Sequence, residues 1–384
     1  MFFNLSRDSL ENFPYHHILP NGLVLNTDDG WEVYTVDNHT VIVKGYANQF
    51  SLSEIINDLI THDVPVYKGN FCAIVADSEY VKILHDTNRG FPLWKSDVSI
   101  TNLAPLEEQI WADQILTIHS DMKVKKSYFK TYVKNTDNLT DEKIIDKLHS
   151  TICDTYEQFL SHNTKPLKIF ISGGIDTTTA WAYLDYFTKN YEIVDYEYIK
   201  FTTFWMRNKN AIKRLWAYTQ VHLWDKDCVL VSGGNGDEYF LRGPSTLALA
   251  LKKYDLEFQD ILEPTDYHYR HFNKYLPDLY DSINKDYPTI KDIQDHILNI
   301  NINDHQHWHL DRTLMFTPFK DISLLSTVLC CSKDLLLAQA KNACINRELI
   351  GKLDKSKLDG ISSQKNFDQF ENISSKITNK ILTR

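Results

Sequence analysis

Two glycines, an acid and several hydroxyl side chains gather in residues 172–179, Ser-Gly-Gly-Ile-Asp-Thr-Thr-Thr. Gly173 and Gly174 lack the Cβ atoms that would keep backbone N–H groups away from an anion. A helix that begins near Asp176 would point its positive end at the same anion. The carboxylate of Asp176 would repel phosphates unless a divalent cation lay between them. The stretch therefore predicts a site for the phosphates of a nucleotide together with Mg²⁺.

Two elements have to hold this loop in place. Before it, Ile169, Phe170 and Ile171 carry the β-branched and aromatic side chains of a buried strand. After it, apolar residues recur at helical spacing from residue 180 to residue 187, so that they would face a sheet. We expect strand, phosphate loop and helix in this order. The alternative is that the two glycines form a helix-capping turn that binds no ligand.

A second glycine-rich turn follows a second predicted strand at residues 227–232. In a parallel sheet the carboxyl ends of neighbouring strands meet at one edge, and ligands bind there. We therefore expect this turn to place another carboxylate over the same phosphates as Asp176. The turn contains Gly233, Gly234, Gly236, Asp237 and Glu238.

Both turns resemble motifs of one enzyme group. The first resembles the pyrophosphate loop, Ser-Gly-Gly-x-Asp-Ser, of the ATP pyrophosphatases, which include asparagine synthetase and β-lactam synthetase, and Thr177 keeps the hydroxyl of the last Ser. The second is similar to the asparagine synthetase motif Ser/Thr-Gly-x-Gly-x-Asp-Glu-x-Phe, but Gly234 stands where asparagine synthetases carry an acid. Lys365 stands in a segment that resembles their Arg-x-Lys-x-x-Phe loop, with Ser363 in place of the Arg.

This resemblance implies an ATP-dependent ligase that forms amide bonds. A substrate carboxylate would be adenylated with release of pyrophosphate, and ammonia or an amine would then displace AMP. Asp176 and Asp237 would hold Mg²⁺, Lys365 would stabilise developing charge, and Asp237 and Glu238 would belong to the catalytic set. The expected nucleotide-binding residues are Ser172, Gly173, Gly174, Ile175, Asp176, Thr177, Gly233 and Gly234.

The N-terminal third is predicted to contain strands at residues 22–25, 31–36, 40–44, 69–77 and 80–86, with a helix at 52–60 capped by Ser51 or Ser53. The last two strands and the segment after them resemble the glutamine amidotransferase domain of asparagine synthetase. Working glutaminases of this class use an N-terminal Cys as nucleophile, whereas this sequence begins Met-Phe-Phe. The resemblance therefore implies this fold without glutaminase activity. The matching positions are Gly69, Phe71, Asp77, Asp86, Pro92, Leu93 and Trp94.

The expected fold class is α/β with two domains. Residues 1–125 would form an Ntn-hydrolase-like αββα sandwich, residues 126–145 a polar linker, and residues 146–384 a synthetase domain with the Rossmann-like parallel sheet of adenine-nucleotide α-hydrolases. A helix at 144–159 would lead into the phosphate loop. Its apolar stripe consists of Ile144, Leu148, Ile152 and Tyr156.

Composition limits the partners. The net charge of −10 argues against a nucleic-acid or anionic-membrane surface. The six cysteines include no Cys-x-x-Cys pair and are expected to be reduced thiols. No apolar run approaches membrane-spanning length, and the N-terminus lacks a basic signal region, so a cytoplasmic protein is expected. The expected partners are a small-molecule carboxylate and ammonia or an amine, and a homodimer is allowed for.

Two other functions stay open at this point. One is ATP-dependent modification of a nucleobase or tRNA, which relatives with the same pyrophosphate loop carry out. The other is a catalytically inactive nucleotide-binding scaffold, which Gly234 and the missing N-terminal Cys favour.

Overall fold

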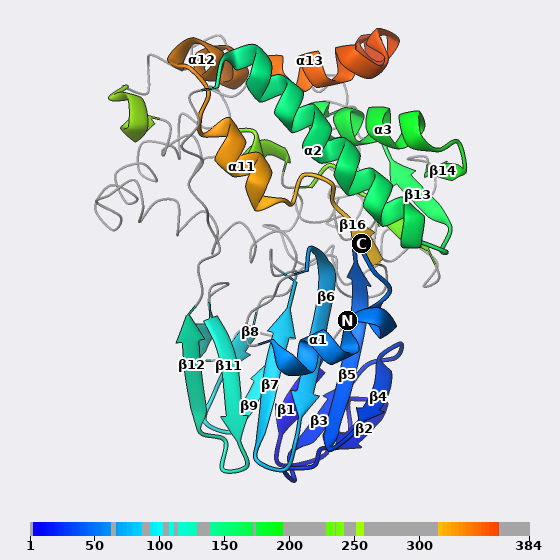
Figure 1. Cartoon of the computed structure of the whole chain (residues 1–384), viewed down its shortest axis with the longest axis vertical. Helices are drawn as coiled ribbons and strands as arrows, with labels where there is room; N and C mark the ends of the chain where they lie inside the picture. The colour runs from blue at the N-terminus through cyan, green and yellow to red at the C-terminus, as the bar shows by residue number, and fades with distance from the viewer. Residues whose placement is uncertain are drawn as a thin grey trace, which may run out of the picture. The chain divides into compact units, whose positions relative to one another are not determined.

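The computed structural model describes residues 3–62, 67–86, 93–102, 107–110, 114–128, 139–171, 174–194, 228–234, 236–241, 251–256 and 314–360. These residues form two compact units (Figure 1). The first unit contains those within Met1–Val133 and Gln158–Thr164, and the second those within Lys134–Glu157, Lys165–Ile297 and Arg312–Arg384.

The first unit is built on two antiparallel sheets of six strands each. One sheet has the order β10-β8-β9-β1-β3-β2 and the other the order β12-β11-β7-β6-β5-β4. The strands of the first sheet are β1 (Phe3–Ser6), β2 (Tyr15–Ile18), β3 (Val24–Thr27), β8 (Leu93–Lys95), β9 (Ser99–Thr101) and β10 (Glu108–Ile110). Those of the second are β4 (Glu32–Val36), β5 (His39–Ala47), β6 (Gly69–Ala76), β7 (Tyr80–His85), β11 (Gln114–His119) and β12 (Val124–Tyr128).

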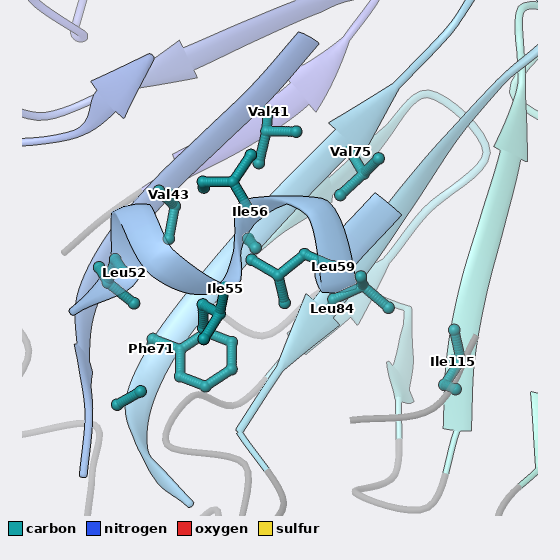
Figure 2. Close-up of a cluster of buried hydrophobic side chains, with 12 residues drawn as sticks. Val41, Val43, Leu52, Ile55, Ile56, Leu59, Phe71, Val75, Leu84 and Ile115 are labelled. Carbon is teal, nitrogen blue, oxygen red and sulfur yellow. The ribbon is translucent and has the colours of Figure 1, made fainter. Parts of the chain in front are cut away.

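A short helix covers one face of the second sheet, where the sequence predicted one. It begins as the 3₁₀ turn η1 (Leu52–Ile55) and continues as α1 (Ile56–Thr61). Ser51 is its N-cap residue, and the carboxylate of Glu54 accepts hydrogen bonds from both the N–H and the hydroxyl of Ser51, each at 2.7 Å, in a capping box. Figure 2 shows the buried cluster beneath the helix. Its members include Leu52, Ile55, Ile56, Leu59, Val41, Val43, Phe71, Val75, Leu84 and Ile115.

The opposite face of the second sheet is also buried. Successive side chains of a strand point to opposite faces, and Ile42, Cys72 and Ile74, which alternate with members of the cluster, are at most 2% exposed. Two sheets and one covering helical layer are therefore in place. The second helical layer of the predicted αββα sandwich is not among the described residues.

Two elements of the structure overlap the ends of the predicted linker at residues 126–145. Val124–Tyr128 forms β12, which pairs with β11 at the edge of its sheet, and α2 already begins at Asp141. The lysine-rich composition of β12 suggested a linker because it lacks an apolar run. An edge strand, however, tolerates lysines, which discourage pairing with another chain, and Lys126 forms an ion pair with Glu108.

The second unit contains a four-stranded parallel sheet in the order β14-β13-β15-β16. This confirms the predicted parallel sheet. The strands are β13 (Leu167–Phe170), β14 (Tyr191–Val194), β15 (Val229–Val231) and β16 (Leu314–Phe316). The helical elements are α2 (Asp141–His162), α3 (Ile175–Phe187), α5 (Gly236–Tyr239), α11 (Ile322–Val328), α12 (Lys333–Asn342), α13 (Cys344–Leu353) and η5 (Lys355–Gly360). Only the part of α2 before Gln158 belongs to this unit.

The predicted apolar stripe of α2 is buried, and its last residue, Tyr156, contacts α3. Figure 1 shows the two helices. All four stripe residues, Ile144, Leu148, Ile152 and Tyr156, are 0% exposed. The Tyr156 ring stacks on Tyr183 of α3 at 6.0 Å, and its hydroxyl donates to the Ala180 carbonyl at 2.7 Å. Tyr156 therefore joins α2 to the helix that carries Asp176.

Candidate functional site

The first glycine-rich turn joins β13 to α3, so the predicted strand, turn and helix occur in this order. Gly174 is the N-cap of α3 and offers no side chain to the N–H groups of the first helical turn. The positive end of this 13-residue helix therefore lies at the predicted anion site. Ser172 and Gly173 lie outside the described residues.

The three consecutive threonines at the start of α3 differ in their surroundings. Thr178 and Thr179 are buried, and their hydroxyls donate to the carbonyls of Gly174 at 2.9 Å and Ile175 at 2.8 Å. Thr177 is only half-buried. Of the three hydroxyls, that of Thr177 best fits the predicted role at a phosphate.

The second glycine-rich turn lies directly against the first. β13 and β15 are parallel neighbours, with Leu167 opposite Val229, so the turns that follow them meet at the same edge of the sheet. A Cβ atom added to Gly233 would lie 2.5 Å from the backbone nitrogen of Thr177, and one added to Gly236 would lie 2.5 Å from Oδ1 of Asp176. No side chain fits at either glycine. The close contact of the two turns therefore requires glycine at 233 and 236.

This contact brings the two predicted metal ligands into one neighbourhood. Asp237 follows Gly236 in the chain, so its backbone lies beside the carboxylate of Asp176. The half-buried carboxylate of Asp176 is an oxygen donor of the kind that Mg²⁺ prefers, and it fits the predicted cation. The side chains of Asp237 and Glu238 lie outside the described set, as does Lys365.

Two buried amides support Asp176, and no sequence motif indicated either of them. Asn346 of α13 donates from Nδ2 to Oδ1 of Asp176 at 3.2 Å and to the hydroxyl of Thr179 at 3.3 Å. Gln339 of α12 donates from Nε2 to Oδ1 of Asn346 at 2.9 Å. Both amides are 0% exposed. For Asn346 the sequence does hold one signal, a polar residue among apolar ones on a buried helix face. Its neighbours Ile345, Leu349 and Ile350 are buried as well.

The segment after β16 lies beside the second turn and is structural. A Cβ atom on Gly234 would lie 3.8 Å from the Thr317 methyl group. The ring of Phe319 packs on that of Phe240, with 5.2 Å between the ring centroids. The Asp321 carboxylate caps α11 by accepting a hydrogen bond from the Ser323 N–H at 2.8 Å. These residues therefore support the turn.

An ionic cluster anchors the far end of α3. The Asp185 carboxylate contacts Lys189 at 2.7 Å, Lys357 of η5 at 3.0 Å and the Tyr191 hydroxyl at 2.7 Å. The Lys357 ammonium also lies 3.6 Å from the centre of the Trp181 ring. The cluster ties η5, the last described element, to the helix that carries Asp176.

This cluster predicts an acid-sensitive contribution to stability. Burial raises the pKa of Asp185, but hydrogen bonds from Lys189, Tyr191 and Lys357 outweigh burial and lower the pKa from 3.8 to about 2. Because the folded value lies below the unfolded one, the stabilisation is complete above about pH 4 and is lost as the pH falls through 2. We expect Asp185→Asn to lower the thermal unfolding midpoint at neutral pH and the difference from wild type to shrink on acidification. A difference that stays constant down to about pH 3 would contradict this.

The cysteines are free thiols in the structure, as predicted. Burial raises the pKa of Cys331 to about 12 and those of Cys153 and Cys344 to about 11, so these thiols stay protonated at neutral pH.

Within the described ranges, no group of three or more His, Cys, Asp or Glu side chains could hold a metal ion. In the same ranges, no helix has the length and apolar character needed to cross a membrane.

Comparisons with known proteins assign no family. No protein family and no curated protein matches the sequence. The solved structures that match include an allosteric regulatory enzyme of purine biosynthesis, 10% identical with a TM-score of 0.21, over 38% of this chain and 46% of that one. They also include the glutamine phosphoribosylpyrophosphate amidotransferase from B. subtilis, 9% identical with a TM-score of 0.23, over 65% of this chain and 71% of that one. The chain thus spans less than half of the first of these proteins, and similarity at this level assigns neither fold nor activity.

Proposed function

We propose that the protein is an ATP-dependent ligase that adenylates a substrate carboxylate, releases pyrophosphate and joins the acyl group to ammonia or an amine with release of AMP. The observation that carries this proposal is the direct contact between the two glycine-rich turns, with the Asp176 carboxylate against Gly236. Each of the two glycine-rich turns follows a strand of the parallel sheet and carries an acidic residue. This arrangement suits a nucleoside triphosphate and its magnesium ion.

The roles of the residues follow from their chemistry. The backbone N–H groups of Gly173, Gly174 and Ile175 would bind the pyrophosphate, with the hydroxyls of Ser172 and Thr177. Asp176 and Asp237 would hold Mg²⁺, which would offset the negative charge of the phosphates and polarise the bond between the α-phosphate and the departing pyrophosphate. Lys365 would stabilise the charge that develops as the substrate carboxylate attacks, and Glu238 completes the proposed catalytic set.

The first unit would serve as a glutaminase-like scaffold that makes no ammonia. Cys72 lies inside β6 and is 2% exposed, so it cannot act as a terminal nucleophile. In this proposal ammonia or an amine reaches the second unit from solution. We expect that glutamine does not replace ammonia as the nitrogen source.

The test is formation of AMP and pyrophosphate from Mg-ATP. One reaction contains aspartate and ammonium, a matched reaction contains aspartate and glutamine, and a third contains a pool of small molecules from host cells. AMP with ammonium but not with glutamine is the result expected of an ammonia-dependent asparagine-forming enzyme. AMP only with the pool identifies a ligase for another carboxylate, which fractionation of the pool would reveal.

Absence of AMP in all three reactions would overturn the proposed activity. If ATP still raised the thermal unfolding midpoint under those conditions, the protein would be a nucleotide-binding scaffold without turnover. If tRNA or a free nucleobase alone stimulated AMP formation, the chemistry would be modification of that base.

A further inference from the structure

The buried amides of Gln339 and Asn346 connect the two glycine-rich turns. Gln339 donates to the Phe240 carbonyl, directly after α5, at 3.0 Å, and Asn346 donates to Asp176 in the first turn of α3 at 3.2 Å. The two amides also bond each other at 2.9 Å. A continuous chain of hydrogen bonds thus runs from Phe240, just after the second turn and α5, to the predicted metal ligand.

Backbone groups fix the orientation of both amides. The N–H of Ile345 donates to Oε1 of Gln339 at 2.8 Å, and the Phe240 carbonyl accepts from its Nε2. A backbone N–H can only donate and a carbonyl can only accept, so Gln339 cannot be flipped. Nε2 of Gln339 therefore faces Oδ1 of Asn346, and Nδ2 of Asn346 has to face Asp176.

The position of Asn346 depends on an unusual junction between helices. Ala343 ends α12 and begins α13 in the left-handed region, with φ of 56°. This conformation is unfavourable for a residue with a Cβ atom. The Ala343 side chain packs in a cluster with Ile175, Ala182 and Ile350, which presses the start of α13 against the first turn of α3. The packing thereby sets the distance between Asn346 and Asp176.

A neutral amide suits a carboxylate that has to bind a cation. A carboxylate has about four acceptor sites, so one amide hydrogen bond restricts its rotation and leaves its charge in place. A lysine or arginine at position 346 would instead neutralise Asp176 and compete with Mg²⁺. Outer hydrogen bonds of this kind orient metal ligands in many proteins, and their loss typically lowers metal affinity by about 10- to 100-fold.

We propose that Asn346 is a positioning residue, held by Gln339, that orients the Asp176 carboxylate toward a divalent cation bound with the nucleotide. The inference rests on the proposed function, because it gives Asp176 the cation that the ATP site requires. It adds a residue that no sequence motif indicated.

The test measures binding of Mn²⁺, an oxygen-seeking substitute for Mg²⁺, by electron paramagnetic resonance with the non-hydrolysable analogue α,β-methylene-ATP. Asn346→Ala and the volume-matched Asn346→Leu are expected to weaken Mn²⁺ binding about 10-fold. Binding of the analogue without metal should change less than about 2-fold, and the Mg²⁺ concentration for half-maximal AMP formation should rise in parallel.

Two controls separate positioning from structural damage. Thr179→Val removes the other acceptor of the Asn346 amide but leaves Asp176 untouched, so it should lower the unfolding midpoint and keep wild-type Mn²⁺ affinity. Asn342→Ala makes the same asparagine-to-alanine change at an exposed position of α12. It should change neither the unfolding midpoint nor the Mn²⁺ affinity. Asn346→Leu fills the site if the alanine variant fails to fold.

The outcomes distinguish the two proposals. If the wild type binds Mn²⁺ with the analogue and a folded Asn346 variant binds it equally well, the positioning role is wrong and the ligase proposal stands. If the wild type binds neither the analogue nor Mn²⁺, the ligase proposal fails and the positioning role falls with it. Selective loss of Mn²⁺ affinity in the Asn346 variants would support both.

Discussion

Asp176→Asn is expected to lower AMP formation from Mg-ATP by about 100-fold or more. The substitution removes the negative charge that would hold Mg²⁺, and a metal ion supplies several kcal/mol of charge stabilisation in such reactions. The fold should survive, because the asparagine oxygen can still accept the hydrogen bond that Asn346 donates at 3.2 Å. Loss of an acid from the first turn of α3 should cost about 1 kcal/mol or less of stability.

The measurement is steady-state AMP formation at saturating ATP, with an unfolding curve for the same preparation. Asp185→Asn is the matched control, since it makes the same change further along α3, within the cluster of Lys189 and Lys357. This control should be less stable but should turn over ATP at a near wild-type rate below its unfolding midpoint. Wild-type turnover by Asp176→Asn would refute the metal assignment.

Gly233→Ala is expected to separate the two glycine-rich turns and to abolish turnover. The added Cβ would lie 2.5 Å from the Thr177 nitrogen, 2.6 Å from the Asp176 carbonyl carbon and 2.7 Å from the Thr177 Cα. All three are backbone atoms that cannot rotate away, so one of the turns has to move. Overpacking of this kind costs about 1–3 kcal/mol, and a shift of about 1 Å at the site is enough to impair catalysis.

Gly234→Ala is the control for this prediction, because it adds the same methyl group one residue later. The nearest atoms to its Cβ would be Ser232 Oγ at 3.3 Å and the Thr317 methyl at 3.8 Å, both on side chains. We expect a change in unfolding free energy of less than about 1 kcal/mol. Because Gly234 is itself an expected nucleotide-binding residue, the readout of this control is unfolding and not AMP formation. Equal losses of stability for the two substitutions would contradict the close contact between the turns.

Much of this architecture could be predicted from short stretches of sequence. Period-two and helical spacing located the strands on either side of Asp77, the helix after Ser51 and the stripe on α2, because each pattern is completed within a few residues. The glycines of the two turns were recognisable for the same reason. Composition failed at β12, since an edge strand can be as polar as a linker.

Only the tertiary structure showed which residues meet at the site. The sequence by itself determined that Asp176 follows a strand and opens a helix, and that a second glycine turn follows another strand. It also indicated that the two turns would meet at one edge of the sheet. It did not indicate that Gly233 would lie against the Thr177 backbone and Gly236 against the Asp176 carboxylate, or that Asn346, 170 positions away from Asp176, would donate to that carboxylate. Such contacts depend on how α13 packs against α3 and on the left-handed turn at Ala343. Local sequence patterns carry no record of that packing, because the contacting residues share no short segment of the chain.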